Sequence, residues 1–189
     1  MGKNGDEYLT GRLLVAMPGL EDPNFAKTVV YICAHSEEGA MGLVINRPME
    51  ALTFPEMLDQ LNIPHGGDSD SIQVQFGGPV EAGRGFVLHT SDYLQESTLP
   101  IDEQVSLTAT IDILKAIAEG RGPDHCLLTL GYAGWSPGQL DDEMLANGWL
   151  TVEPDENLIF DPDLEHKWDK AIEKLGIDLT LLSTDAGHG

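Results

Sequence analysis

The 189-residue sequence has few basic residues, few cysteines and no long apolar segment. Only 10 Lys and Arg stand against 32 Asp and Glu, which gives a formal net charge of −22. A nucleic-acid backbone is repelled by such a chain, because binding to phosphates needs clustered Lys or Arg. We therefore expect no direct contact with nucleic acid.

Two further absences bear on compartment and protein class. No stretch reaches the roughly 18 uninterrupted apolar residues of a membrane helix, and residues 1–10 lack the apolar segment of a secretory signal. The two cysteines, Cys33 and Cys126, lie far apart in apolar segments and form no C-x-x-C pair. They are expected to be buried thiols in a reducing environment. We therefore expect a cytoplasmic protein that makes no membrane contact.

Recognised catalytic and cofactor motifs are also missing. The six histidines show neither H-x-H nor H-E-x-x-H spacing, so no metal site is predicted. Gly83-Arg-Gly85 begins a dinucleotide fingerprint, but Leu88 replaces its third glycine. In Gly131–Trp135, Ala133 stands where a nucleophile elbow needs serine. The sequence predicts no cofactor and assigns no catalytic residue.

The residue patterns that are present favour one α+β domain spanning residues 1–189. Strands cluster early and helices occur singly, which indicates a largely antiparallel sheet and disfavours a doubly wound parallel one. A Thr53-x-x-Glu56 capping box marks the first helix. Further helices are expected to end at Gly120, to begin at Ser136 and to begin at Pro162. Strands are expected at 11–17, 28–35, 40–46, 72–76, 85–90, 104–108, 126–130 and 149–152.

Gly131–Trp135 is rich in glycine and aromatic residues and is expected to connect a strand to the helix beginning at Ser136. Amides at the start of that helix could receive an anion. The acidic residues of its early turns oppose this. A structural corner is the preferred interpretation, and an anion site is the alternative.

Lys167, Lys170 and Lys174 recur at helical spacing near the carboxyl end. Acidic residues alternate with them, so a solvated helix face is the preferred interpretation. The alternative is a short basic stripe.

His89 falls at the end of a predicted strand, close in sequence to Asp92. A hydrogen-bonded structural histidine is the favoured interpretation, and a general base is the alternative. Arg47 is expected to pair with a carboxylate. A hydrolase with His89 as base and Arg47 or Arg84 as anion anchor stays open, because sites assembled from distant segments leave no motif.

Four phrases of the sequence are long, ordered and specific: AMPGLEDPNFAKTVVYICAHSEEGAMGLVINRP, FGGPVEAGRGFVLHT, LGYAGWSPGQLDDEMLANGWL and the closing DAGH. Together they closely resemble the AlgH/YqgE family of bacterial proteins. The resemblance runs from about Leu9 to His188 and implies an α+β domain whose mostly antiparallel, bifurcated sheet folds into a pseudo-barrel with flanking helices. Family members are labelled uncharacterised or as transcriptional regulators, and the family supplies no catalytic residues to carry over.

These observations predict a non-catalytic binding or regulatory module that acts through a protein partner or a small ligand. Its groove is expected between the Gly77–Pro79 turn and the Gly131–Trp135 turn, where Gly, Tyr and Trp gather at strand ends. Any transcriptional effect would then be indirect. The candidate binding residues are Asn46, Arg47, Gly77, Gly78, Pro79, His89, Gly131, Tyr132, Gly134, Trp135 and Gln139.

Overall fold

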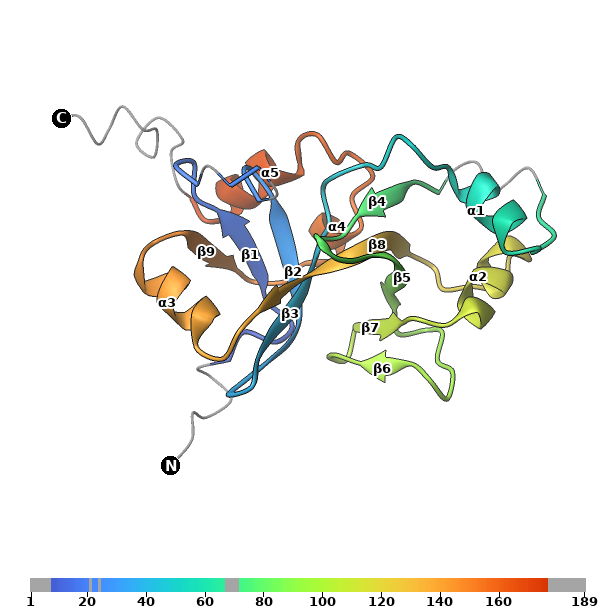
Figure 1. Ribbon diagram of the computed structural model, residues 1–189, viewed down its shortest axis with the longest axis horizontal. Helices are drawn as coiled ribbons and strands as arrows, with labels where there is room; N and C mark the ends of the chain where they lie inside the picture. Colours follow the sequence, from blue (N-terminus) through green and yellow to red (C-terminus); the bar gives the residue numbers. More distant parts are fainter. Residues whose placement is uncertain (1–7, 21, 24, 67–71, 177–189) are drawn as a thin grey trace.

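The computed structural model describes residues 8–20, 22–23, 25–66 and 72–176 and arranges them around one curled sheet (Figure 1). The closing phrase at Asp185–His188 lies outside these residues. The strands are β1 (Leu13–Ala16), β2 (Val29–Ser36), β3 (Gly39–Val44), β4 (Val74–Phe76), β5 (Val80–Thr90), β6 (Leu99–Pro100), β7 (Val105–Thr108), β8 (Cys126–Trp135) and β9 (Trp149–Val152). The helices are α1 (Phe54–Gln60), α2 (Ile111–Ala118), α3 (Gln139–Leu145), α4 (Glu156–Ile159) and α5 (Lys167–Lys174).

The sheet branches along β8. The described strands follow the order β6-β7-β5-β8-β3-β2-β1-β9, and β4 pairs with β8 off this path. β5 pairs along one edge of β8, while β4 and β3 share the other edge. β4 lies opposite Leu128–Leu130 in parallel, and β3 lies opposite Ala133–Trp135 in antiparallel register. The predicted α+β pseudo-barrel with a mostly antiparallel, bifurcated sheet is therefore confirmed.

Local sequence signals account for several elements. The capping box of α1 forms as predicted, because Thr53 Oγ1 accepts the Glu56 N–H and the Glu56 side chain accepts the Thr53 N–H. α2 ends just before Gly120, which has a φ of +78°. β2 and β3 form the expected hairpin, with Ser36 opposite Gly39.

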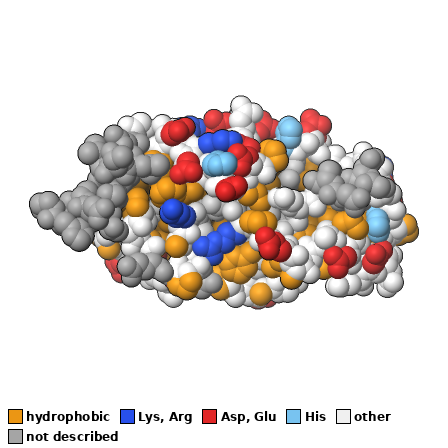
Figure 2. Space-filling model, turned by 90° about the horizontal axis from the view of Figure 1, so that it is seen from above, with side chains coloured by type: hydrophobic (Ala, Val, Ile, Leu, Met, Phe, Trp, Pro, Cys, Tyr) orange, Lys and Arg blue, Asp and Glu red, His pale blue; other side chains and the backbone are white. Residues whose placement is uncertain are grey.

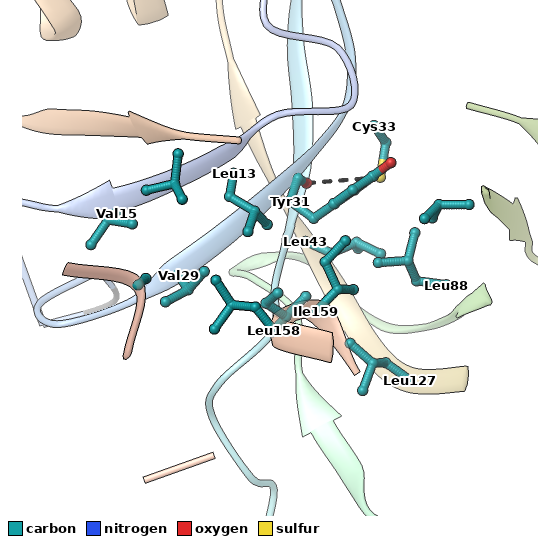
Figure 3. Packing of buried hydrophobic residues seen from close by; sticks show 14 of the residues in the cluster. Leu13, Val15, Val29, Tyr31, Cys33, Leu43, Leu88, Leu127, Leu158 and Ile159 are labelled. Carbon is teal, nitrogen blue, oxygen red and sulfur yellow. Dashed lines mark hydrogen bonds between the residues drawn. The ribbon is translucent and has the colours of Figure 1, made fainter. Parts of the chain in front are cut away.

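Helices cover both faces of the sheet, and the buried hydrophobic side chains of the described residues form three clusters. α1 and α2 pack against Val87 and Leu128, whereas α3 packs against the other half of the sheet through Leu140. α4 and α5 cover the largest cluster. Figure 3 shows its centre, where Leu158 and Ile159 of α4 lie against side chains from β1, β2 and β3.

Both cysteines are free thiols in apolar surroundings. Cys33 is buried in the largest cluster, beside Tyr31 (Figure 3), and Cys126 is half-buried. Burial raises the pKa of Cys33 to about 12 and that of Cys126 to about 11. Both are therefore poor nucleophiles at neutral pH, because the thiolate is the reactive form.

The Gly131–Trp135 segment is the second half of β8, and the prediction that it connects strand to helix was wrong. Antiparallel pairing of Ala133–Trp135 with β3 keeps the segment extended despite its glycines. The helix begins at Gln139 rather than at Ser136, after Gly138 in the left-handed region. The Ser136 N–H donates to Gln139 Oε1 at 2.9 Å, so this amide already has a partner.

The carboxyl-terminal helix also begins later than its proline predicts. The Asp161 carboxylate accepts the N–H of Asp163, and this turn delays α5 until Lys167. The short helix α4 and the two-residue strand β6 were not predicted. Trp168 and Ile172 lie on the buried face of α5, as their helical spacing predicts.

Lys167 does not belong to a solvated face or to a basic stripe, and both interpretations of it were wrong. Its side chain is fully buried, and its Nζ donates to the carbonyls of Ile45 at 2.9 Å and Ile159 at 2.8 Å. Burial lowers the pKa of Lys167 to about 7. Lys170 and Lys174 form ion pairs with acidic residues. On the face shown in Figure 2, some basic side chains lie beside acidic ones and others lie beside hydrophobic ones.

The branch point depends on close approach of two glycine-containing segments. The Gly77 N–H donates to the Leu130 carbonyl of β8, and the Gly77 carbonyl accepts the Val44 N–H of β3, each at 2.8 Å. A Cβ on Gly131 would overlap the Gly78 carbonyl, and Gly131 has a φ of +79°. Only glycine meets both requirements without strain.

We expect Gly131→Ala to lower the free energy of unfolding by about 3 kcal/mol or more, since it combines a left-handed conformation with steric overlap. Gly83→Ala in β5 is the control, because a Cβ there meets nothing within 4 Å. That control should leave stability unchanged or slightly raised. Urea unfolding followed by circular dichroism measures both, and equal stability of the two variants would contradict the branch-point argument.

Candidate functional site

Asn46 and Arg47 hold a neighbouring loop in place. Asn46 Oδ1 accepts the Val29 N–H, and its Nδ2 donates to the Lys27 carbonyl, both at 3.0 Å. The Arg47 guanidinium donates to the carbonyls of Pro23 at 2.7 Å and Ala26 at 2.9 Å. The described contacts of Arg47 are thus with backbone carbonyls, and the expected carboxylate is not among them.

Gly77, Gly78 and Gly131 are brought together, but by direct backbone contact at the branch point. The two segments therefore leave no ligand-sized space between them. A hollow lies beside this contact. It is lined by Val80, the residue after Pro79, and by Tyr132 and Gly134 of β8.

Trp135 and Gln139 take part in a network centred on Glu143 of α3. Glu143 Oε1 accepts the indole N–H of Trp135 at 3.1 Å and that of Trp149 at 3.0 Å. Gln139 Nε2 donates to the other carboxylate oxygen at 2.9 Å. The two indole rings meet edge to face, and Phe25 packs against both. Trp135 is only 7% exposed, so most of its surface stabilises the fold.

His89 is fully buried in a polar network. Its Nδ1 lies 2.8 Å from the Thr90 carbonyl, which can only accept, so Nδ1 carries the proton. In the neutral ring Nε2 then accepts the Thr108 hydroxyl at 2.8 Å, and Thr108 contacts Thr98 at 2.8 Å. Burial lowers the pKa of His89, outweighing the Thr90 carbonyl and the Asp92 carboxylate, which raise it. This arrangement favours the neutral ring, and both ring nitrogens are engaged in hydrogen bonds.

A groove of about 680 Å³ lies beside the second half of β8, and we call it the bulge groove. Its lining combines apolar, aromatic and charged residues from β3, β5 and β8 and from the segment around β6 and β7. The lining residues are Ala40, Met41, Val80, Glu81, Arg84, Phe86, Ser97, Leu99, Leu107, Ala109, Tyr132, Gly134, Trp135 and Ser136.

A β-bulge forms one wall of this groove. Val80 pairs with Tyr132 and Gly85 with Leu130, so the intervening residues of β5 are extra and bulge outward. Glu81 has a φ of +46°, which is uncommon for a residue with a side chain. The sequence signal for this bulge is the glycine pair around Arg84, Gly83 and Gly85.

The bulge places Arg84 over an aromatic surface. Its guanidinium lies 5.1 Å from the Phe86 ring centre and 3.7 Å from the Glu81 carboxylate. The Tyr132 ring meets Phe86 edge to face at 5.8 Å. Arg84 keeps 55% of its side chain exposed. Of the predicted binding residues, Tyr132, Gly134 and Trp135 line this groove. Arg84, which was predicted only as the anion anchor of a hydrolase, lines it too, and Phe86 was not predicted.

The described residues show neither a metal cluster nor a membrane helix. Nowhere among them do three His, Cys, Asp or Glu residues gather as metal ligands. Within the same residues, no helix combines the length and apolar character needed to cross a bilayer. The bulge groove offers aromatic stacking, apolar contact and the accessible guanidinium of Arg84.

Fold and groove together define an α+β pseudo-barrel protein with a branched sheet and a mixed, open groove beside the branch. The chain belongs to the family described as AlgH-like, whose model matches residues 13–180. It is 54% identical to a UPF0301 protein of Rhodopseudomonas palustris strain HaA2, over 96% of this chain and 87% of that protein. It is 56% identical to a UPF0301 protein of Rhodospirillum rubrum, over 96% and 94%.

Solved structures are similar over almost the whole chain. The solution structure of AlgH from Pseudomonas aeruginosa is 44% identical, covers both chains completely and superposes with a TM-score of 0.79. The crystal structure of a Corynebacterium diphtheriae protein is 20% identical, covers 97% of this chain and 95% of that one, and has a TM-score of 0.75. The second likeness concerns the fold alone.

Glu143→Leu is expected to lower the free energy of unfolding by about 2 kcal/mol or more, because two largely buried indole N–H groups lose their acceptor. Glu143→Gln keeps an oxygen acceptor and should cost less. Urea unfolding followed by tryptophan fluorescence compares them. Equal losses would show that the hydrogen bonds to the indoles contribute little.

The neutral, buried state of His89 predicts a loss of stability in mild acid. As pH falls below the ordinary histidine pKa of about 6.5, the unfolded chain takes up a proton before the folded one, whose His89 pKa is lower. The free energy of unfolding should then fall, by up to about 1.4 kcal/mol per pH unit for this one group. His89→Gln should remove that part of the slope between pH 7.5 and 5.5.

His166 is the control for this measurement. Its hydrogen bond to Asp163 raises its pKa, so its contribution has the opposite sign and is lost as pH rises. His166→Gln should therefore leave the acid-induced loss intact or steepen it slightly. A His89→Gln profile identical to the wild-type profile would contradict the assignment of the slope to His89.

Proposed function

We propose that this protein is a non-catalytic, cytoplasmic binding module that acts in regulation by capturing a protein partner at the bulge groove. The observation that carries the proposal is the exposed Arg84 guanidinium stacked over Phe86, with Tyr132 packed against the same ring. Arg and aromatic residues are the types enriched at the centres of protein interfaces. A groove of this size and mixed character suits the side chains of a partner.

The histidine geometry supports binding over hydrolysis. A general base must reach the proton that it removes, and His89 is enclosed with both ring nitrogens engaged. Arg47 directs its described hydrogen bonds to loop carbonyls and is not available there as an anion anchor. The bulge groove also lacks both residues.

The charge balance supports an indirect regulatory role. A net charge of −22 disfavours direct contact with DNA, since counterion release requires basic residues at the phosphates. A regulatory effect is then exerted through another protein. The same charge gives Arg84 weight, because Arg84 is the only basic residue among the described residues that line the bulge groove, and it can orient a partner that carries an acidic group.

Affinity capture from the protein's native cytosol tests the proposal, with quantitative mass spectrometry of the retained proteins. Wild-type protein is compared with Arg84→Glu and Tyr132→Ser. We expect one partner whose recovery falls at least tenfold with either variant, since both remove contacts at the centre of the groove.

Arg121→Glu is the matched control. Arg121 is exposed, pairs with Glu119 two residues earlier and lies outside the bulge groove, so the variant makes the same charge change elsewhere. Its recovery of the partner should equal that of wild type. Retention of identical proteins by folded groove variants, or equal loss with Arg121→Glu, would refute the proposal.

A further inference from the structure

A second hollow, which we call the helix groove, lies on the other side of the bulge between α1 and α2. Its volume is about 360 Å³, within the range of pockets that bind small molecules. Met57 of α1 and Leu61, the residue after α1, form one wall. Ile111 and Leu114 of α2 form the other, and Leu128 and Leu130 of β8 lie beneath.

The floor of the helix groove is open because two residues of β5 are glycines. A Cβ on Gly83 would meet nothing within 4 Å, and one on Gly85 would meet only Leu130 Cδ2, at 3.8 Å. Neither residue has a left-handed φ, so the backbone does not require glycine. Glycine inside a strand weakens it and often marks a place where a ligand approaches the backbone closely.

The charge of the lining restricts what can bind. None of the described residues that line the helix groove is Asp, Glu, Lys, Arg or His, although 22% of the chain is charged. A charged ligand would lose hydration there without gaining a counterion. Thr110 and Gln60 are among the few polar side chains. The complement to this lining is a neutral molecule with an apolar body.

The mouth of the groove carries exposed apolar side chains. Leu61 is 38% exposed and Ile111 is 49% exposed, one in each wall. Both helices are fixed to the sheet by buried residues of the same cluster, including Phe54 and Ile113. The two walls are therefore held apart by the core, and the groove is formed before a ligand arrives.

We propose that the helix groove is a binding site for a small, neutral, mainly apolar molecule. This site is separate from the bulge groove and does not depend on partner capture there. The ligand packs on the glycine floor between α1 and α2, and adding a side chain to that floor removes the site without disturbing the sheet.

The test is a fluorescence titration with N-phenyl-1-naphthylamine, a neutral apolar dye that brightens on leaving water. Wild-type protein should bind one dye molecule saturably. Gly85→Leu fills the floor and should weaken binding at least tenfold. The anionic dye 1-anilinonaphthalene-8-sulfonate should bind wild type at least tenfold more weakly, because the described lining residues include no cation.

Gly19→Leu is the matched control, since a Cβ there also meets nothing within 4 Å and Gly19 does not line the helix groove. It should bind the neutral dye as wild type does. Circular dichroism and thermal unfolding confirm that each variant folds. If Gly85→Leu does not fold, Ile111→Gln at the mouth replaces it and should also weaken binding.

Three results would overturn the proposal: no saturable binding by wild type, unchanged binding by the folded groove variants, or equal binding of the two dyes. Light scattering adds a fourth. If wild type is a dimer that Ile111→Gln dissociates, a second copy of the chain covers the groove instead of a small molecule. None of these outcomes bears on Arg84, so the partner proposal stands or fails separately.

Discussion

Backbone contact between Gly77–Gly78 and Gly131 is the constraint on which the rest of the structure depends. Gly77 directly follows β4; its N–H donates to β8, and its carbonyl accepts from β3. This one residue therefore links β4 to β3, the two strands that share an edge of β8. A side chain at Gly131 would push these segments apart. The branch would then open, and the two halves of the sheet would lose their common strand.

The same branch explains why two grooves lie next to each other. β5 must pair with β8 on both sides of the glycine contact, and it does so with extra residues that form the bulge. The bulge projects Arg84 toward the bulge groove, while Gly83 and Gly85 floor the helix groove. Ala109 lines both grooves, so the two proposed sites are neighbours that share this residue.

Many residues that carry the family resemblance stabilise this scaffold. Asn46 and Arg47 hold a loop, Trp135 packs beside Trp149, and His89 completes a buried network. The polar groups of these residues are engaged in hydrogen bonds within the protein. The resemblance is for this reason strong evidence of fold, whereas the two proposed binding sites depend on residues of the bulge and of the helices beside it.

The sequence by itself determined the elements whose cause is local: the capping box at Thr53, the hairpin from β2 to β3, the helix ending before Gly120 and the antiparallel fold class. Tertiary structure alone decided that Gly131–Trp135 stays extended, that Lys167 is buried and that β5 bulges. The partners of the first two lie far away in sequence: Ala133–Trp135 pair with β3, and the Lys167 ammonium donates to the Ile45 carbonyl. Hydrogen bonds to distant partners leave no local pattern, because the pairing is set only when the chain folds.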